Sequence, residues 1–469
     1  MATEPNAARP AAPPRKGLLH ARPILLIAFA FAVMGDPVSS VAYAIEAALR
    51  ALHGNLGLLI ATMSVVLGII ALVDINYHQL IGRFPRGGGS AAAAASSFGE
   101  GWAFLPLGAL IVDYALTIAI SVAAGASAII AYVPALAPDR IPIALALTLL
   151  VAALTWFGHG GRAIFAAMTI AFVIVTLFVL GHGFGHPLAA GPLLPQPRQS
   201  GWLGAAAVIF AFPVGMALAT GTEAPSSAIA QLGQLDDRSR VSFGRITIWL
   251  TLGIVAVMTL GLTILAVNLR AGIPGPNSTQ IADIAAFAVG RGGLFAAFQG
   301  ASALLLLSAA NSSFNAGPGL LKALARHEAS GGVGILPSWL ASTNRHHTPY
   351  WGVVVFLAVS ALLIVVAGGD DQVLVLFYAV AVFVGFLFGL LAMAVVSRHE
   401  RNWGSLAVNV LGALLVILTL AIDLVRIYPI ASLVAAGLIA LFLYVGWVRA
   451  GRPSGVLQVE AMAEQSDES

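Results

Sequence analysis

The chain interrupts two of its apolar runs with short segments of similar composition, Gly35-Asp36-Pro37-Val38-Ser39-Ser40 and Gly221-Thr222-Glu223-Ala224-Pro225-Ser226-Ser227. Each segment holds, in this order, a glycine, an acid, a proline and a pair of serines. Proline removes a backbone donor and clashes with the preceding helical turn, so we expect each helix to unwind here. Backbone freed in this way is tolerated at membrane depth only where it lines a cavity. These two breaks decide the fold that the sequence predicts.

Apolar segments of membrane-spanning length follow one another along most of the chain. Hydrophobic residues make up 59% of the sequence and charged residues 9%, with a mean hydropathy of +0.93. Soluble domains carry roughly 25% charged residues, so the chain is predicted to be an all-α integral membrane protein. We predict about twelve spans, near residues 24–48, 56–75, 103–133, 141–158, 163–183, 202–230, 245–268, 294–318, 351–367, 371–395, 404–424 and 430–448.

The positions of the basic residues test this span count. With twelve spans, 17 of the 23 Lys and Arg residues fall on the side of the N-terminus and 6 on the other side. Positive residues gather in cytoplasmic loops, which predicts a protein of the cell membrane with both termini in the cytoplasm. Residues 1–22, rich in Pro and Ala, are predicted to be a disordered tail, and residues 449–469 a second cytoplasmic tail.

The two breaks also indicate an internal repeat. They lie in the first and sixth spans, and an odd offset of five spans gives the two halves opposite topology. Transporters of the five-plus-five type have this layout, with the substrate site at the breaks. The predicted units are residues 23–190 for helices 1–5, 201–398 for helices 6–10 and 403–448 for helices 11–12. A pair of plain proline kinks is the alternative, but kinks alone would not place an acid in each break.

Three carboxylates, Asp36, Asp113 and Glu223, lie deep in apolar sequence. Each costs about 2.5–3.5 kcal/mol at the centre of a membrane helix. No predicted span has a Lys or Arg at mid-depth to pair with them. The three acids must therefore be protonated, bind a cation, or alternate between these states. This combination indicates cation transport coupled to protons.

Hydroxyl groups accompany the acids. The spacing of Asp113, Thr117 and Ser121 puts all three on one stripe of a helix. Hydroxyl, carbonyl and carboxylate oxygens can replace the water shell of a hard cation, although lone hydroxyls in membrane helices more often bond their own backbone or a neighbour. The remaining candidates near the breaks and in the third, eighth and tenth spans are Tyr43, Tyr114, Thr220, Thr222, Asn311, Ser312 and Tyr378.

Other polar residues receive a structural interpretation. Glu46, Asp74 and Asp423 lie closer to span ends and are interpreted as snorkelling or vestibule residues. His182 and His186 have a spacing that could hold a metal, but their Gly/Pro-rich segment is typical of a loop. The chain has no cysteine, which excludes disulfides and thiolate metal sites. The spread of bases does not indicate nucleic-acid binding, and no nucleophile–base pair or metal motif indicates an enzyme.

Over roughly residues 23–400 the chain resembles the amino acid–polyamine–organocation superfamily. Within it, the sequence is most similar to KimA-type potassium importers and more distantly to the Kup potassium-uptake family. The resemblance rests on motifs in the first, third, sixth, eighth and tenth spans and in the loop after the second. They are GDPVSSVAY at 35–43, RFPRGGGS at 83–90, DYALT at 113–117, TGTE at 220–223, NSSF at 311–314 and LFYAV at 376–380.

This resemblance implies a LeuT-like fold with discontinuous first and sixth helices, and potassium–proton symport without a cofactor. The matching potassium-site positions are Asp36, Tyr43, Asp113, Thr117, Thr220, Glu223 and Tyr378, with one or more of the acids carrying the proton. One departure is that KimA proteins have a large cytosolic C-terminal region, whereas only 20 residues follow Arg449 here. Nucleotide regulation through such a region is therefore not expected.

Two other transport functions stay open at this point. A proton-coupled amino acid permease captures the substrate carboxylate on free N–H groups at the first break. Asp36 and Glu223 would repel that carboxylate, so a cationic amino acid or a polyamine is the better version of this alternative. A channel is less well supported, because two discontinuous helices in inverted repeats favour alternating access. The sequence leaves the oligomeric state open, with a homodimer as one alternative.

Overall fold

A computed structural model describes residues 16–158, 162–192, 201–326 and 333–465. These residues form helices and no strand. The first half of the chain contains α1 (Lys16–Val33), α2 (Gly35–Ser39), α3 (Val41–Ala51), α4 (Leu56–Arg83), α5 (Gly89–Phe98), η1 (Glu100–Ala103), α6 (Phe104–Tyr132), η2 (Pro134–Asp139), α7 (Arg140–Trp156) and α8 (Arg162–Gly185).

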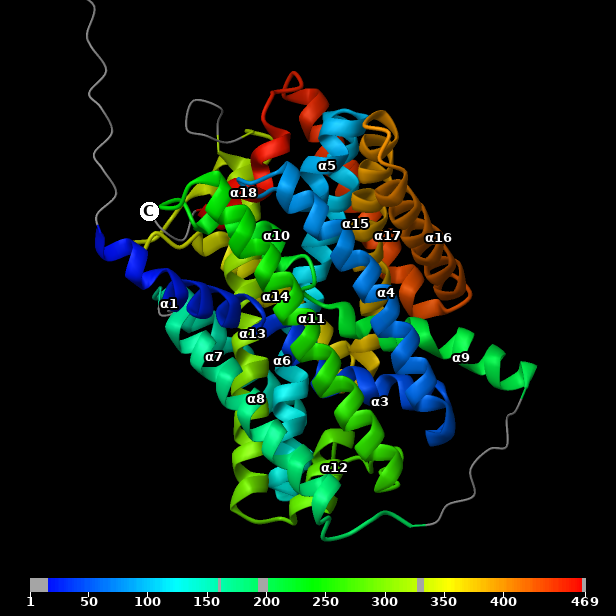
Figure 1. The fold of residues 1–469 in the computed structure, drawn as a ribbon. Helices are drawn as coiled ribbons and strands as arrows, with labels where there is room; N and C mark the ends of the chain where they lie inside the picture. The colour runs from blue at the N-terminus through cyan, green and yellow to red at the C-terminus, as the bar shows by residue number, and fades with distance from the viewer. Residues whose placement is uncertain (1–15, 159–161, 193–200, 327–332, 466–469) are drawn as a thin grey trace, which may run out of the picture.

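The second half begins with another interrupted helix and ends in short helices. It contains α9 (Trp202–Gly215), η3 (Met216–Ala219), α10 (Ala224–Ala228), η4 (Ile229–Gln231), α11 (Asp237–Asn268), α12 (Gln280–Val289), α13 (Gly293–Ala325), η6 (Ser338–Ala341), α14 (Tyr350–Val366), α15 (Asp371–His399), α16 (Trp403–Asp423), α17 (Ile427–Arg449), η7 (Val456–Gln458) and α18 (Val459–Gln465). Figure 1 shows α5 and α18 at one end of the bundle and α12 at the other. We call these the α18 end and the α12 end.

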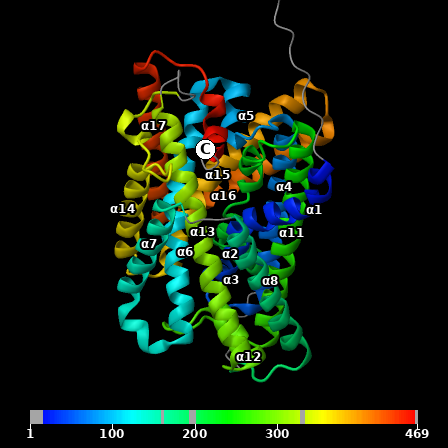
Figure 2. The same ribbon diagram turned by 90° about the vertical axis from the view of Figure 1, so that its left-hand side faces the viewer.

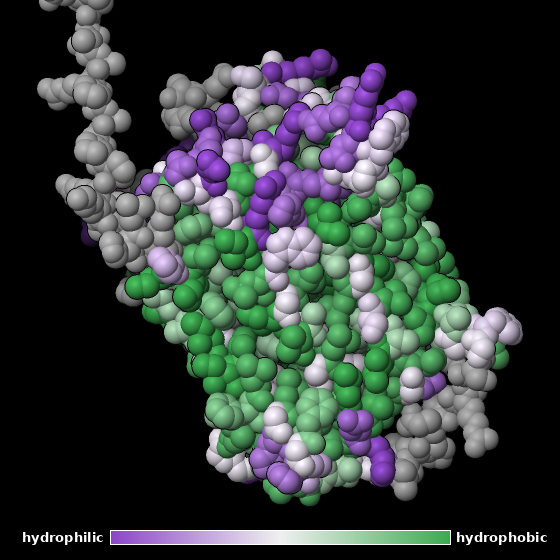
Figure 3. Space-filling view, viewed as in Figure 1, coloured by the Kyte–Doolittle hydropathy of each residue, from purple (hydrophilic) through white to green (hydrophobic). Residues whose placement is uncertain are grey.

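The helices suit a bilayer in length and in surface. Within the described residues, ten helices are long and apolar enough to cross a membrane, and shorter apolar helices lie at Pro23–Val33, Gln280–Val289 and Tyr350–Val366. Figure 3 shows a broad apolar belt between two polar ends. The predicted class, an all-α integral membrane protein, is confirmed. The count of twelve spans stays a prediction.

Both apolar runs are divided into shorter helices at the predicted segments. The first apolar run is divided into α1, α2 and α3, with α2 beginning at Gly35. The sixth run is divided into α9, η3 and α10, and Pro225 occupies the first turn of α10, where a missing N–H costs nothing. The hydroxyl of Ser40 donates to the carbonyl oxygen of Leu218 at 2.9 Å. The two interrupted helices therefore meet at their breaks.

The backbone conformation differs between the two breaks. The sixth run leaves helical geometry at Thr220 and Gly221, whereas Met34 and Ser40 on either side of α2 keep helical φ and ψ. The unwinding of both helices therefore stays a prediction.

Helix α6 runs through the centre of the bundle and packs against α13, α15 and α17 (Figures 1 and 2). Gly108 allows α17 to come close. A Cβ at this position would lie 2.6 Å from the carbonyl oxygen of Ala436 and 2.7 Å from the backbone nitrogen of Ala440. Small residues allow such close helix contacts in membranes. Close packing from several sides thus holds α6, which carries the predicted stripe of polar residues.

Both predicted tails differ from the observed structure. Helix α1 begins at Lys16, so the tail predicted for residues 1–22 is wrong from Lys16 onward, while residues 1–15 lie outside the described residues. The segment predicted as a C-terminal tail, residues 449–469, contains η7 and α18, and Val459 of α18 is fully buried. The burial of its few apolar residues explains why this polar segment is helical and packed.

Candidate functional site

The two acidic breaks are in direct contact. The carboxylate of Asp36, on α2, lies against the backbone of Gly221, where a Cβ would be 2.8 Å from Oδ2. Gly221 also has φ +71, which residues with side chains rarely adopt. Gly221 is thus needed both for the turn and for the close approach of the acid. The acid of the first motif, Asp36, therefore packs against the glycine of the second motif, Gly221.

Tyr43 and Thr220 form a second link between the breaks. The Tyr43 hydroxyl donates to Thr220 Oγ1 at 3.2 Å, and Thr220 Oγ1 donates to the carbonyl oxygen of Ala217 at 2.7 Å. Both side chains are buried. The pair fixes the orientation of the Thr220 hydroxyl beside the non-helical turn that follows η3.

Helix α6 supplies the predicted polar stripe. Asp113, Thr117 and Ser121 are all buried, and each has a side-chain oxygen without a hydrogen-bond partner. The Tyr378 hydroxyl of α15 faces the Asp113 carboxylate, although its geometry falls short of a hydrogen bond. Buried polar atoms are nearly always paired in folded proteins. A stripe of unpaired oxygens therefore indicates a place for a ligand or for water.

The three predicted acids lie close enough to act on one another electrostatically. Asp36 and Glu223 are partly buried and Asp113 is fully buried. Oδ1 of Asp36, Oδ1 of Asp113 and Oε2 of Glu223 have no hydrogen-bond partner. Among the described residues, no ion pair joins any of the three to Lys or Arg. The site therefore collects negative charge without a fixed positive partner.

The secondary candidates divide into two groups. Thr222 is buried at the sixth-helix break, and Tyr114 is partly buried on α6. Asn311 instead accepts a hydrogen bond from Thr155 at 2.9 Å, which ties α13 to α7, and Ser312 is exposed. Of the α13 pair, Asn311 thus serves as a tie between helices and Ser312 points away from the site.

The snorkelling interpretation of Glu46, Asp74 and Asp423 is wrong, whereas their role as vestibule residues stays a prediction. Their side chains are 3%, 4% and 1% exposed. Glu46 pairs with Arg50 at 2.8 Å and accepts from the backbone N–H of Gln280 at 2.9 Å. Their positions near span ends suggested access to water, but neighbouring helices cover them, and only packing shows this.

The metal alternative for the histidine pair finds no support in the geometry. His182 lies within α8, not in a loop, and its Nδ1 is 2.9 Å from the carbonyl oxygen of Ala288. In the part of the chain that the structure describes, no group of three or more His, Cys, Asp or Glu side chains is arranged to chelate a metal. A weakly coordinated monovalent cation, held largely by neutral oxygens, does not need such a group.

Two acids that the sequence reading did not single out lie near the site. Asp371, at the start of α15, accepts a hydrogen bond from Ser127 at 2.6 Å on the α12 side. Glu460 of α18 lines the same narrow cavity as Asp113 and Glu223. The sequence contains one indication of this contact. The run Gly87-Gly88-Gly89 has no side chains, so another segment of the chain can approach its backbone, as Glu460 does at Gly89.

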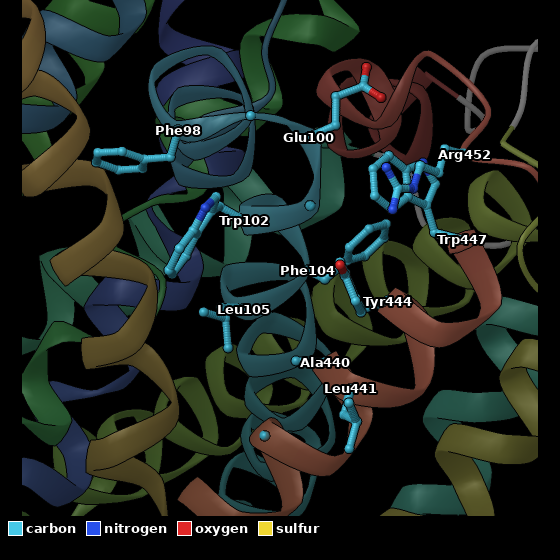
Figure 4. A pocket seen from close by; sticks show the side chains of 13 residues that line it. Phe98, Glu100, Trp102, Phe104, Leu105, Ala440, Leu441, Tyr444, Trp447 and Arg452 are labelled. Carbon is cyan, nitrogen blue, oxygen red and sulfur yellow. The ribbon is translucent and has the colours of Figure 1, made fainter. Parts of the chain in front are cut away.

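A larger pocket of about 600 Å³ lies apart from the breaks, between η1, α6 and α17 (Figure 4). Its wall is largely aromatic, including Trp102, Phe104, Tyr444 and Trp447, and Glu100 and Arg452 also line it. None of the predicted site residues lines it. Trp and Tyr at this level of a membrane protein are typical of the lipid–water interface.

Comparisons with known proteins agree with this architecture. The sequence model of the amino acid permease family matches residues 24–448. The potassium transporter KimA of Bacillus subtilis (strain 168) is 30% identical over 410 residues, covering 82% of this chain and 64% of KimA. The chain thus matches less than two thirds of the length of that relative. A solved mutant of the Eremococcus coleocola manganese transporter is 14% identical, with a TM-score of 0.50 over 94% of this chain and 97% of that one, a likeness of fold alone.

The family match covers nearly the whole helical bundle, including both breaks and the α6 stripe. The predicted resemblance to the amino acid–polyamine–organocation superfamily and the predicted LeuT-like fold are thereby confirmed. The chain belongs to the amino acid permease family of the amino acid–polyamine–organocation superfamily, and it is a multi-pass membrane transporter.

Proposed function

We propose that the protein imports potassium together with protons by alternating access. The cation binds between the two broken helices and α6, near Asp36, Thr117, Thr220 and Tyr378. The similarity to KimA, which is a potassium transporter by name, supports potassium as the substrate. The acids balance the charge of the cation and of the co-transported proton, and the proton belongs to the coupled group of acids as a whole.

One observation carries this proposal. Unpaired buried oxygens of Asp36, Asp113, Thr117, Glu223 and Tyr378 gather at the breaks, and among the described residues no Lys or Arg pairs with the three acids. Buried carboxylates without partners are strongly unfavourable. A dehydrated potassium ion or a proton removes that cost, so the site favours a cation over a substrate that carries its own carboxylate.

The orientation follows from the positive residues. We place the α18 end in the cytoplasm and the α12 end outside, in the plasma membrane, because most Lys and Arg residues fall on the α18 side. In this orientation potassium leaves the site toward α18. The two repeats rock against each other around the site, as in other transporters built from inverted repeats.

Growth of a bacterial strain without its own potassium uptake tests the proposal. The wild-type protein should restore growth at low potassium, and rubidium uptake into proteoliposomes should increase with an inward proton gradient. Asp113→Asn and Glu223→Gln should each lower uptake at least about a hundredfold, because each removes a charge that neutral helices cannot replace. Thermal unfolding of the purified variants checks that they remain folded.

The matched control is Glu400→Gln. Glu400 is about half exposed and pairs with Arg83 on the surface, so its loss should leave uptake unchanged. If the expressed wild-type protein fails to restore growth, potassium is the wrong substrate. If both acid variants keep their activity, the site lies elsewhere.

A permease for cationic amino acids or polyamines is the second candidate. The description of the matching family and the absence of a fixed base at the breaks both favour it. Labelled lysine, arginine and putrescine should be offered to the same proteoliposomes. Uptake of one of these, with no rubidium uptake, would select this function instead.

A further inference from the structure

The C-terminal segment is a packed element of the α18 end. After α17 the chain passes through Gly451 and Gly455, both with positive φ, into η7 and α18. Val456 and Val459 are 1% and 0% exposed. Helix α18 packs against α5, α10 and α13 (Figures 1 and 2). The last described helix therefore closes this end of the bundle.

The linker between α17 and α18 is anchored independently of α18. The guanidinium of Arg452 lies 5.8 Å from the centre of the Trp447 ring, and Trp447 Nε1 donates to the carbonyl oxygen of Pro453 at 3.0 Å (Figure 4). The N–H of Gly455 donates to Glu100 Oε1 at 3.3 Å. Gly455 has φ +106. It therefore stands at the junction between an anchored linker and the two short helices that follow, η7 and α18.

Glu460 brings α18 into contact with two other elements. Its Oε1 accepts a hydrogen bond from the Ser227 hydroxyl of α10 at 2.5 Å, and the carboxylate also lies near the backbone N–H of Ala91 in α5 without a hydrogen bond to it. A Cβ at Gly89 would overlap this carboxylate. Glu460 is 4% exposed. One buried side chain therefore connects the C-terminal helix to the distal half of the broken sixth helix.

The same carboxylate faces the transport site through a narrow cavity. Tyr77, Ser90, Asp113, Glu223 and Glu460 are among its lining residues. The volume that the centre of a water-sized sphere can occupy in this cavity is about 20 Å³. This is enough for one water or one dehydrated ion of similar size. Oε2 of Glu460, Oε2 of Glu223 and Oδ1 of Asp113 have no partner. Free carboxylate oxygens thus occur both on the site side of the cavity and on α18.

We propose that Glu460 is a further cation-contacting residue of the pathway and that α18 is its cytoplasmic gate, latched by the bond to Ser227. The inference rests on the proposed import of a monovalent metal cation. The acids of this cavity are not arranged to chelate one ion together. A cation therefore passes from the level of Asp113 and Glu223 to Glu460, and leaves when α18 swings away about Gly455.

The latch and the rocking motion are mechanically connected. Ser227 belongs to α10, the segment that follows the acidic break of the sixth helix. Alternating access requires the two repeats to move against each other. Breaking the bond between Glu460 and Ser227 frees α10 from α18, so release of the gate accompanies the opening of the site to the cytoplasm.

The absence of cysteine from the chain provides a direct test. The single change Ser90→Cys places a thiol in the cavity wall behind α18. Its rate of labelling by a charged, membrane-impermeant thiol reagent, applied to the cytoplasmic face of inside-out vesicles, reports opening of the gate. Ser338→Cys is the control, because Ser338 lies exposed on η6 away from the cavity.

Two variants weaken the latch without touching the central site. In potassium-free buffer, Ser227→Ala and Glu460→Ala should each speed labelling at position 90 at least about tenfold, since each removes a hydrogen bond to a buried carboxylate. The rate at position 338 should not change. Unchanged labelling at position 90 in both variants would overturn the gate.

The cation contact is tested separately with Glu460→Gln, which keeps an acceptor for Ser227 and removes the charge. Potassium should slow labelling at position 90 in the parent and should no longer do so in this variant, and rubidium uptake should fall at least about tenfold. Full potassium protection with normal uptake would show that α18 is only a structural cap, and overturns this role for Glu460.

The outcomes separate this inference from the proposed function. If the wild-type protein transports rubidium but the Glu460 and Ser227 variants behave like their parent, the inference fails alone. If the wild-type protein transports no rubidium and potassium gives no protection, the proposed function fails and the cation contact falls with it. The labelling rates at position 90 in potassium-free buffer then show by themselves whether α18 acts as a gate.

Discussion

The buried acids at the two ends of the bundle are held in different ways. At the α12 end, Glu46 is held by Arg50 and by the N–H of Gln280, and Asp371 is held by Ser127, which in turn accepts from Arg140. At the α18 end, one carboxylate on a short helix accepts from Ser227. The first set of contacts includes a bond between two long helices, α6 and α15, whereas the second uses a segment that follows the last long helix.

This difference separates two requirements of a transporter. Ser127 and Asp371 lie on the long helices α6 and α15, so we expect their bond to part only when whole repeats move, and it reports the position of the repeats. A short helix on a glycine hinge can leave while the bundle stays in place. Opening at the α18 end is therefore expected to need less rearrangement than opening at the α12 end, and the following predictions test that contrast.

The largest effect is expected for Glu46→Ala. This change leaves Arg50 and the N–H of Gln280 without their buried partner, and should lower the free energy of unfolding by about 3 kcal/mol. Thermal unfolding in detergent measures it. Glu400→Ala breaks an exposed pair with Arg83 and should cost less than about 1 kcal/mol. Equal losses in the two variants would contradict strong contacts at the α12 end.

Ser127→Ala tests the second link at the same end. Ser127 donates to Asp371 at 2.6 Å and accepts from Arg140 at 2.8 Å. Its loss leaves Oδ1 of the buried Asp371 carboxylate without its donor, while Oδ2 keeps the bond from Gln372 at 2.9 Å. The change should cost about 2 kcal/mol of unfolding free energy. Ser96→Ala is the matched control, because Ser96 bonds only within its own helix, to Ala93. If Ser127→Ala lowers the free energy of unfolding no more than Ser96→Ala does, the bond between Ser127 and Asp371 does not stabilise the α12 end.

The docking of α18 should depend on pH. Burial raises the pKa of Glu460, while the hydrogen bond from Ser227 and the nearby N–H of Ala91 act in the opposite direction. Docked α18 then binds a proton more tightly than released α18. Docking is most stable below the ordinary pKa of a glutamate and is lost as the pH rises through the raised pKa.

Labelling of the Ser90→Cys variant measures this dependence. After division by the rate for Ser338→Cys, which corrects for ionisation of the thiol, it should rise with pH by up to about tenfold per unit. Tyr77, Asp113 and Glu223 face the same cavity. Adding Glu460→Gln should flatten the profile, and a slope that persists would assign the titration to one of those three groups.

The smallest effect is expected at the hinge. Gly455 has φ +106 in the docked state, so Gly455→Ala should destabilise docking by about 1 kcal/mol and speed labelling at position 90 about fivefold. The control is Gly437→Ala within α17, where a Cβ meets nothing within 4 Å. Slower labelling in Gly455→Ala would show that this residue is strained in the released state instead.

The sequence predicts the parts of this molecule that depend on local chemistry. Runs of apolar residues predict the long helices, and a proline beside a glycine and an acid marks where the first and sixth runs divide into shorter helices. Helical spacing alone groups Asp113, Thr117 and Ser121, and all three are buried with unpaired oxygens. Contact between the breaks, through Asp36 and Gly221, follows from the inverted repeat.

The remaining features depend on partners far away in the chain. Glu46 is buried because Gln280 of α12 covers it, and no local pattern announces that helix as its partner. Glu460 lies in a polar segment that would be read as a tail, and its burial depends on Gly89, Ala91 and Ser227. Neither hydropathy nor periodicity indicates contacts between residues so far apart in the chain. The positions of Glu46 and Glu460 could therefore be found only from the folded structure.

The position of α18 has a practical consequence for the study of this protein. Helix α18 ends at Gln465, and its Glu460 lines the cavity that also holds Asp113 and Glu223. An affinity tag or fluorescent protein attached directly after Gln465 would be carried by the helix that we propose as the gate. Rates measured on such fusions would report the attachment as well as the transporter, so purification handles belong at the N-terminus, and a protease site before any C-terminal fusion would show how much the attachment matters.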